Sequence, residues 1–227
     1  PLMFLILAGI LLLSSHLQAD EPARFPRKVL NTATASYRIS DVGEQTAHSN
    51  VVAMDIEFHT PSELGFWQYA PHVTGGESFR IAPTEYDAGG GNFSPMGVPT
   101  IFGTPLDISG PVTLTQGGVY HKGEPIFLVL KDQDQDIYTD RRDTVLVSIA
   151  IDSLSEKEVL RLTESGENTG IFVGYIQTNS LSPGMYDGIL SVADDVRILA
   201  TYSDKWDGTD TDASAALVDP YGIFFDT

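Results

Sequence analysis

The sequence predicts an all-β protein, with an antiparallel β-sandwich preceded by a β-hairpin unit and a Gly/Pro-rich loop segment. Three observations support this fold class. Apolar and polar residues alternate over many short runs, which is the period of a half-buried strand. Gly, Asp, Asn and Pro separate these runs at short intervals, as they do in sandwiches. After the N-terminal apolar run, no stretch has the 3.6-residue apolar period of a helix.

The clearest strand pattern lies in residues 159–178, which we expect to form the central hairpin of the sandwich. Leu160 and Leu162 alternate with other side chains, and residues 165–170 supply Gly and Asn, which tolerate the positive φ of turns. Residues 171–176 are apolar on both faces, which is typical of a strand covered on two sides. Within a sandwich spanning residues 112–219, the other expected strands are residues 112–115, 125–131, 144–151, 188–192, 196–202 and 213–218.

Two further segments precede the sandwich. Residues 20–60 alternate over 29–40 and again over 50–58, which predicts a β-hairpin. Two strands are marginally stable alone, so this hairpin must pack on another part of the protein or be completed by another chain. Residues 61–111 are rich in Gly and Pro and are expected to connect the two units, with short strands near 63–69 and 77–82. So long a loop favours a crossing between domains or a wrapped segment.

The N-terminal residues indicate export. An apolar run followed by small and polar residues predicts a signal peptide at residues 1–19, with Asp20 opening the mature chain. The run is shorter than the roughly 20 apolar residues that span a membrane. We therefore expect no transmembrane span after cleavage, and a location at the cell surface, in the outer envelope or outside the cell. A buried N-terminal helix is the alternative. Residues 220–227 are expected to begin a further domain.

Charge and composition exclude several classes of function. The net charge of −18 repels phosphate backbones, so we expect no nucleic-acid partner. The chain has no cysteine, which excludes disulfides, thiol catalysis, and zinc or iron–sulfur sites held by cysteine. An exported protein without cysteine is consistent with a bacterial envelope protein that folds by core packing alone.

Two acidic stretches are candidate calcium sites. The first has carboxylates at positions 1, 3, 5, 9 and 12 of a calcium loop: Asp132, Asp134, Asp136, Asp140 and Asp143. Ile137 stands where an EF-hand has glycine, and the flanks are predicted strands, so a solvated acidic loop is the alternative. The second, weaker candidate comprises Asp204, Asp207, Asp210 and Asp212. If successive strands simply alternate in direction, the two stretches lie at opposite ends of the sandwich, where cations could stiffen a string of modules.

Catalysis has little support in the sequence. The histidines are scattered, and no nucleophile elbow, P-loop or zinc motif occurs. We therefore do not expect an enzyme, although a carboxylate pair for glycoside hydrolysis stays a remote alternative. Phe66, Trp67 and Tyr69 could form a platform for stacking carbohydrate, or could anchor a long loop to a core.

Several runs resemble modules of very large bacterial surface and exported proteins. Similarity to an Ig-like module is carried by the stretches Tyr120-His121-Lys122-Gly123-Glu124-Pro125, Leu160-x-Leu162-Thr163-Glu164-x-Gly166-x-Asn168-Thr169-Gly170, Asp187-Gly188-x-Leu190 and Ala200-Thr201-Tyr202. Residues 30–37 and 49–52 resemble the last two strands of the conserved-repeat module known as domain of unknown function 11. Residues 217–223 resemble the junction with a further repeat or a carboxypeptidase-regulatory-like domain.

The resemblance implies an Ig-like sandwich with a non-catalytic structural or adhesive role, such as domain spacing, display or cell-surface interaction. Its partners would be neighbouring domains of the same polypeptide and a cell-surface or extracellular ligand. Calcium is the ion that could stiffen it. The alternative is a module that binds a glycan or a partner strand through residues 61–111.

Overall fold

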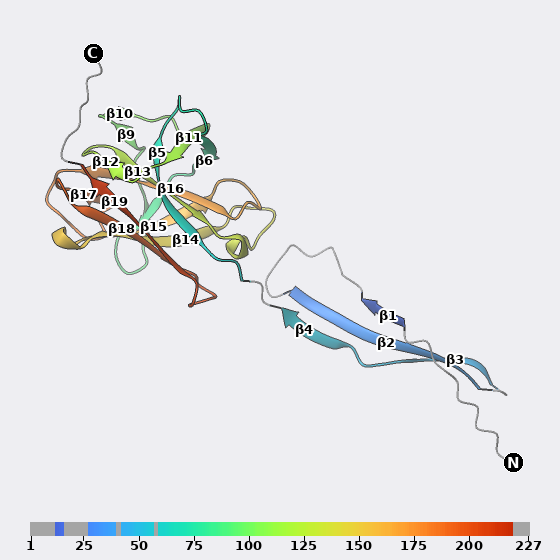
Figure 1. Ribbon diagram of the computed structural model, residues 1–227. Helices are drawn as coiled ribbons and strands as arrows, with labels where there is room; N and C mark the ends of the chain where they lie inside the picture. The colour runs from blue at the N-terminus through green and yellow to red at the C-terminus, as the bar shows by residue number, and fades with distance from the viewer. Residues whose placement is uncertain (1–11, 16–26, 40–41, 57–58, 220–227) are drawn as a thin grey trace. The chain divides into compact units, whose positions relative to one another are not determined.

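The computed structural model describes residues 12–15, 27–39, 42–56 and 59–219, and the chain divides into two compact units, residues 1–58 and 59–227 (Figure 1). The described residues of both units are almost entirely β-strand, which confirms the all-β fold class. No helix in the described part of the chain is long and apolar enough to cross a membrane.

The first unit is a small antiparallel sheet organised around one long strand, β2. Its strands are β1 (Leu12–Ser15), β2 (Arg27–Ile39), β3 (Gly43–His48) and β4 (Val52–Ile56), and β2 pairs with the other three. Part of the predicted signal peptide therefore forms β1, while the rest of residues 1–19 lies outside the described residues. The predicted start of a further domain at residues 220–227 also lies outside them.

Strands β3 and β4 together form the second arm of the predicted hairpin. Thr34 pairs with His48 and Asn31 with Val52, so the register shifts by one residue between them. Such a shift is a β-bulge. At the bulge the Ser49 N–H donates to the carbonyl of Ala33, and the Ala33 N–H donates to Ser49 Oγ, both at 2.8 Å. The polar segment 43–48, which lies between the two predicted arms, pairs with β2 as strand β3, and these bonds keep the chain alongside β2.

The second unit contains the remaining strands. They are β5 (Glu63–Tyr69), β6 (Glu77–Arg80), β7 (Glu85–Asp87), β8 (Phe93–Pro95), β9 (Thr100–Ile101), β10 (Thr104–Pro105), β11 (Pro111–Gln116), β12 (Val119–Tyr120), β13 (Pro125–Lys131), β14 (Thr144–Ile151), β15 (Glu156–Glu164), β16 (Ile171–Asn179), β17 (Ile189–Ser191), β18 (Arg197–Ser203) and β19 (Thr211–Val218). Two short 3-10 turns, η1 (Gln133–Gln135) and η2 (Asp152–Leu154), follow β13 and β14.

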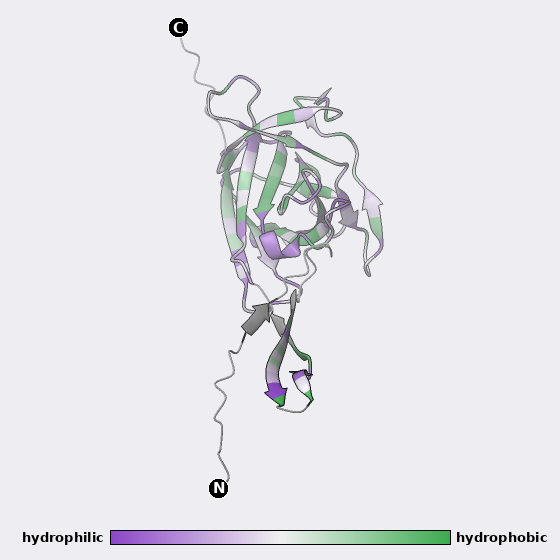
Figure 2. Ribbon diagram, turned by 90° about the vertical axis from the view of Figure 1, so that its right-hand side faces the viewer, coloured by the Kyte–Doolittle hydropathy of each residue, from purple (hydrophilic) through white to green (hydrophobic). Residues whose placement is uncertain are grey.

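These strands form two layers that are joined at one hairpin. One layer has the order β12-β19-β18-β14-β15, and the other has the order β16-β13-β5-β11-β6. The hairpin of β15 and β16 passes from one layer to the other, because only Thr163–Val173 and Glu164–Phe172 pair there. Along the strands, apolar and polar segments alternate (Figure 2), as expected where one face of a layer is buried.

The main core lies between the two layers. On β14, Val145, Val147, Ile149 and Ile151 alternate inward, and they pack with residues of β13, β15, β16, β18 and β19. Strand β16 is buried on both faces, as predicted. Phe172 and Ile176 belong to the main core, whereas Val173 and Tyr175 belong to a second cluster on the outer face of their layer.

The Gly/Pro-rich segment builds and covers this second layer. Strand β5 lies inside the sheet, between β13 and β11, so the compact unit begins at His59 and not at the predicted boundary near residue 112. Phe79 of β6 and the nearby Ile81 pack with Trp67 and Val129 on the outer face of this layer. Further along the segment, β7 pairs with β15 of the first layer. A sequence pattern predicts a strand but not its distant partner, which is why β5 was assigned to a connector.

The predicted aromatic group is divided between the two cores. Phe66 is 3% exposed and belongs to the main core, and Trp67 is 4% exposed and packs edge-on against Phe79 at 5.5 Å between ring centroids. Tyr69 packs, partly buried, against the second cluster. The rings anchor the wrapped segment to the sandwich, so they offer no exposed platform for carbohydrate.

Candidate cation sites

Strand direction brings both predicted acidic stretches to one end of the sandwich. Tyr202, near the end of β18, pairs with Val147, near the start of β14. The β18–β19 turn therefore lies beside residues 132–143, which lead into β14. The β15–β16 turn and the start of β5 meet at the same end, because Glu63 pairs with Lys131 and Lys131 with Ile171. We call this the entry end, since the chain enters the sandwich there.

The prediction that the two acidic stretches lie at opposite ends is therefore wrong. Strand β17 pairs parallel to β16, with Gln177 opposite Ile189, so the chain does not reverse between them. The prediction assumed that every strand runs opposite to the one before it, and so it included a reversal of the chain at this short strand. Without it, β18 runs toward the entry end and delivers Asp204 to the loop that contains Asp132.

The first candidate site, the Asp204 cluster, comprises Asp132, Asp134 and Asp204. One oxygen of each lies within 4.8 Å of the others, and all three residues are buried. The Gln135 Nε2 donates to Asp134 and to Asp204, at 3.1 Å in each case, and joins the two acidic stretches. The Tyr202 hydroxyl donates to Asp132 at 2.7 Å. The cluster could therefore hold a metal ion with oxygen ligands alone.

Burial makes the ionised form of this cluster costly. Desolvation raises the pKa of Asp132 to about 7; the Tyr202 hydrogen bond acts against this shift, while neighbouring Asp134 and Asp204 add to it. The pKa of Asp204 is raised as well, first by burial, although the N–H groups of Asp207 and Trp206 act against the shift. A bound cation would offset the repulsion among these carboxylates.

The second candidate site, the Glu164 cluster, comprises Asp136, Asp143 and Glu164, again with one oxygen of each within 4.8 Å of the others. Backbone donors fix two of the three side chains. The N–H groups of Ile137 and Tyr138 donate to Asp143 Oδ2 at 2.8 and 2.7 Å. Glu164 accepts from the N–H of Asp143 at 2.9 Å, and from those of Thr169 and Gly170 at 2.9 and 2.8 Å.

One oxygen of the Glu164 cluster lacks a hydrogen-bond donor. Asp136 is 4% exposed and its Oδ2 accepts from Gln133 at 3.3 Å, but its Oδ1 is buried without a partner. Burial, with Glu164 and Asp143 nearby, raises the pKa of Asp136 to about 6. An oxygen that is desolvated and unpaired costs free energy unless a proton or a cation binds to it.

The first acidic stretch thus divides between two sites and does not enclose one ion as an EF-hand loop does. Asp132 and Asp134 contribute to the Asp204 cluster, whereas Asp136 and Asp143 contribute to the Glu164 cluster. Asp134 lies within the turn η1, whereas Asp136 caps its C-terminal end, so the turn directs the two side chains to different neighbours. Glu164 was not predicted as a ligand, although it follows Leu160 and Leu162 on the inward face of β15.

The remaining predicted ligands lie outside both clusters. Asp140 is exposed. Asp207 accepts from the N–H and the hydroxyl of Thr209 within its own turn. Asp210 accepts from the N–H and the hydroxyl of Ser62, and Asp212 accepts from the N–H of Leu64 at 2.6 Å. These last two aspartates attach the start of β5 to β19 by hydrogen bonds.

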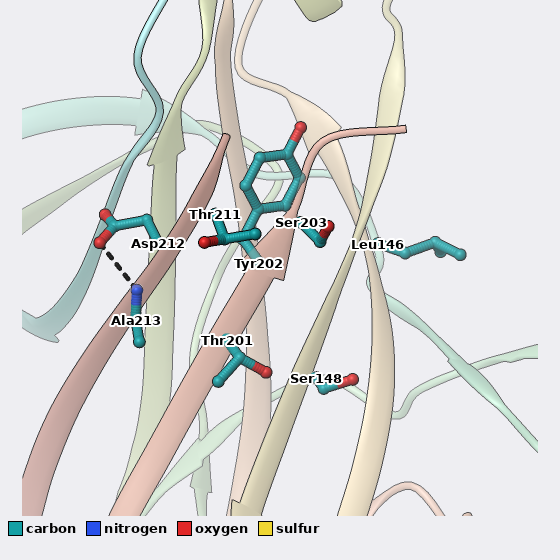
Figure 3. A pocket seen from close by; sticks show the side chains of 8 residues that line it. All are labelled: Leu146, Ser148, Thr201, Tyr202, Ser203, Thr211, Asp212 and Ala213. Atoms are coloured by element: carbon teal, nitrogen blue, oxygen red, sulfur yellow. Dashed lines mark hydrogen bonds between the residues drawn. The ribbon is translucent and has the colours of Figure 1, made fainter. Parts of the chain in front are cut away.

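A shallow pocket lies on the outer face of β14, β18 and β19 (Figure 3). Its titratable groups are Tyr202 and Asp212. The Tyr202 hydroxyl donates to Asp132, and Asp212 accepts from the N–H groups of Leu64 and Ala213. The lining thus holds one carboxylate, whereas glycoside hydrolysis generally needs a pair.

A third group of acidic side chains, which the sequence did not indicate as a site, consists of Glu156, Glu158 and Asp187. It lies at the other end of β15.

Comparison with known proteins finds no family model that matches the chain and no curated protein that matches it.

Proposed function

We propose that residues 59–219 form a calcium-stabilised β-sandwich module of an exported bacterial surface protein. Its role is structural or adhesive and not catalytic: it spaces or displays neighbouring domains of the same polypeptide. The observation that carries this proposal is the pair of buried carboxylate clusters at the entry end, with the unpartnered Oδ1 of Asp136 among them.

The donor atoms favour calcium over other ions. Each cluster offers only oxygen ligands. Calcium is typically coordinated by about six to eight oxygen atoms, whereas zinc is more often held by nitrogen and sulfur. Magnesium demands a near-ideal octahedron and keeps several waters, which suits a buried set of carboxylates less well.

The contacts around the clusters support a structural role. The Thr60 N–H donates to Asp134 at 2.9 Å, and Thr60 Oγ1 accepts from the Asp134 N–H at 3.1 Å. The Asp204 cluster therefore connects the first residues of the sandwich with the loops after β13 and β18. A cation there would hold three separate chain segments together at the point where the chain enters the module.

Thermal unfolding of the full chain tests this proposal. At calcium 100-fold above its Kd, one site stabilises the folded state by about 2.7 kcal/mol. For a domain of this size, that free energy raises the Tm by roughly 5–10 °C relative to chelator. Asp136→Asn should lower the calcium-induced rise, because it removes a ligand charge from the Glu164 cluster.

Asp140→Asn is the matched control, since it removes the same charge from the same loop but at an exposed position outside both clusters. It should leave the calcium-induced rise unchanged, and magnesium should produce a smaller rise than calcium. Identical melting in calcium and in chelator would rule the proposal out.

A further inference from the structure

The third acidic cluster lies at the end of the sandwich opposite to the entry end. Glu156 pairs with Ile151 at one end of the β14–β15 ladder, whereas Thr163 pairs with Thr144 at the other. The turns η1 and η2, coloured yellow-green and gold, mark these two ends (Figure 1). Glu158 and Glu164 are six residues apart on β15, so the third cluster is about 20 Å from the Glu164 cluster.

The third cluster, named here the Glu156 cluster, joins β15 to residues 180–188. Glu156 and Glu158 are 1% and 0% exposed, and Asp187 is an exposed residue of that segment. One oxygen of each lies within 4.8 Å of the others. Oxygens bound to one calcium ion can be at most about 5 Å apart, because each lies 2.3–2.6 Å from the ion. The spacing therefore fits a common ion.

Backbone donors satisfy most of this cluster. Glu158 accepts from the N–H groups of Asp187 and Gly188, at 2.9 and 3.0 Å, and Glu156 Oε2 accepts from the N–H of Gly184 at 2.8 Å. Glu156 Oε1 is buried without a hydrogen-bond partner. The amide of Ser191 lies near the Glu156 carboxylate but does not form a hydrogen bond of normal geometry with it.

The charge of the cluster is not balanced by basic side chains. Burial raises the pKa of Glu156 and of Glu158, the backbone N–H groups act against the shift, and Asp187 adds to it. Among the described residues, no lysine or arginine forms an ion pair with these three carboxylates. A buried charge without a partner is costly, so the cluster favours a cation.

We propose that Glu156, Glu158 and Asp187 form a separate calcium site that fastens residues 180–188 to β15. This inference does not depend on the entry-end clusters, because its residues, its loop and its end of the sandwich are different. The last strand, β19, also ends at this second end, because Leu217 pairs there with Arg197, the first residue of β18. Cations at both ends would therefore stabilise the module where the chain enters it and where β19 ends.

Amide hydrogen exchange of the full chain, with calcium or with chelator, tests this site directly. Peptides covering residues 180–190 report on the amides of Gly184, Asp187 and Gly188, which donate to the two glutamates. If opening of the segment releases the ion, calcium at tenfold above its Kd should slow their exchange by about tenfold. Peptides covering residues 132–143 report on the entry end in the same experiment.

Two variants test the ligands. Glu156→Gln removes a buried charge, and Asp187→Asn removes an exposed one, so the second remains informative if the first fails to fold. Each should abolish calcium protection of residues 180–190 and leave that of residues 132–143 intact. Asp195→Asn is the control, because Asp195 is exposed at the same end outside the cluster, and its φ of 58° suits asparagine.

The outcomes separate this inference from the proposed function. Calcium protection at residues 132–143 without any at residues 180–190 would overturn the inference and leave the entry-end sites standing. Protection at residues 180–190 alone would support the inference and overturn the entry-end sites. Equal loss of protection in Asp195→Asn and Asp187→Asn would also overturn the inference, since a general effect of charge would then explain the result.

Discussion

The buried carboxylates of Asp132 and Asp136 make the stability of the folded protein depend on pH. Desolvation raises the pKa of both, to about 7 and about 6, from an ordinary value of 3.8. Without a cation the folded state therefore retains protons that the unfolded state releases between pH 4 and 7. The stability that these protons contribute is fully present below about pH 4 and is lost as pH rises through 6 to 7.

We therefore expect the Tm of the protein in chelator to fall between pH 5 and pH 8. Calcium must displace the same protons, so the rise in Tm that it produces should grow over this range. Thermal melting at several pH values, with chelator and with calcium, measures both trends. The double variant Asp132→Asn/Asp136→Asn should flatten the chelator curve, and a wild-type Tm in chelator that rose with pH would contradict the assignment.

At the scale of the elements, the close packing of strand β16 requires a glycine at position 174. Gly174 lies opposite Leu128 in the register of β13 and β16. A Cβ at this position would collide with the side chain of Leu162 and lie 3.1 Å from Thr84 Oγ1. That hydroxyl accepts from the Tyr175 N–H at 2.9 Å, which fixes the wrapped segment to the sheet. The glycine thus lets Leu162 and Thr84 pack closely against β16.

Gly174→Ala should lower the free energy of unfolding by about 1–3 kcal/mol, the usual cost of overpacking a core. Urea unfolding in calcium measures this loss. Gly97→Ala is the control, since Gly97 is exposed and a Cβ there meets nothing within 4 Å. Equal stability of Gly174→Ala and the wild type would contradict the packing described for this strand.

The sequence predicted the strands of residues 112–219 well, because alternating apolar residues report burial directly. It did not predict which strands pair: β5 was assigned to a connector, and the parallel course of β17 was counted as a reversal. The very short strands β7 to β10 and β12 were also missed, since two or three residues show no period. Pairing depends on contacts distant in sequence, which one local pattern does not contain.

The candidate sites were predicted only in part, because the carboxylates of each cluster come from segments that are distant in sequence. The sequence assigns the nine predicted aspartates to two separate loops, yet five of the nine belong to clusters completed from distant parts of the chain: Asp132, Asp134, Asp136, Asp143 and Asp204. A signal for the missed ligands was present on β15. Every second residue of β15 lies on one face of the strand, and this face carries Glu156, Glu158, Leu160, Leu162 and Glu164. Because the two leucines face inward, the three glutamates must face inward as well.

At the scale of the whole molecule, the acidic clusters lie at both ends of one sandwich whose core is apolar. Each cluster joins segments that are far apart in sequence: residues 60, 132–134 and 204 at one site, 136–143 and 164 at another, and 156–158 and 187 at the third. The chain has a net charge of −18, so its overall field also attracts cations. If the clusters bind cations as proposed, cation binding would therefore hold together distant segments at both ends of the module.

The most direct test of this account is a count of calcium ions bound per chain by equilibrium dialysis at neutral pH. The three clusters predict three saturable ions for the wild type, falling to two in Asp136→Asn and to two in Glu156→Gln. Because the clusters are separate, the double variant should bind one ion. A wild-type chain that bound no calcium saturably would contradict the account, and the clusters would then be acidic surfaces held by protons and backbone hydrogen bonds alone.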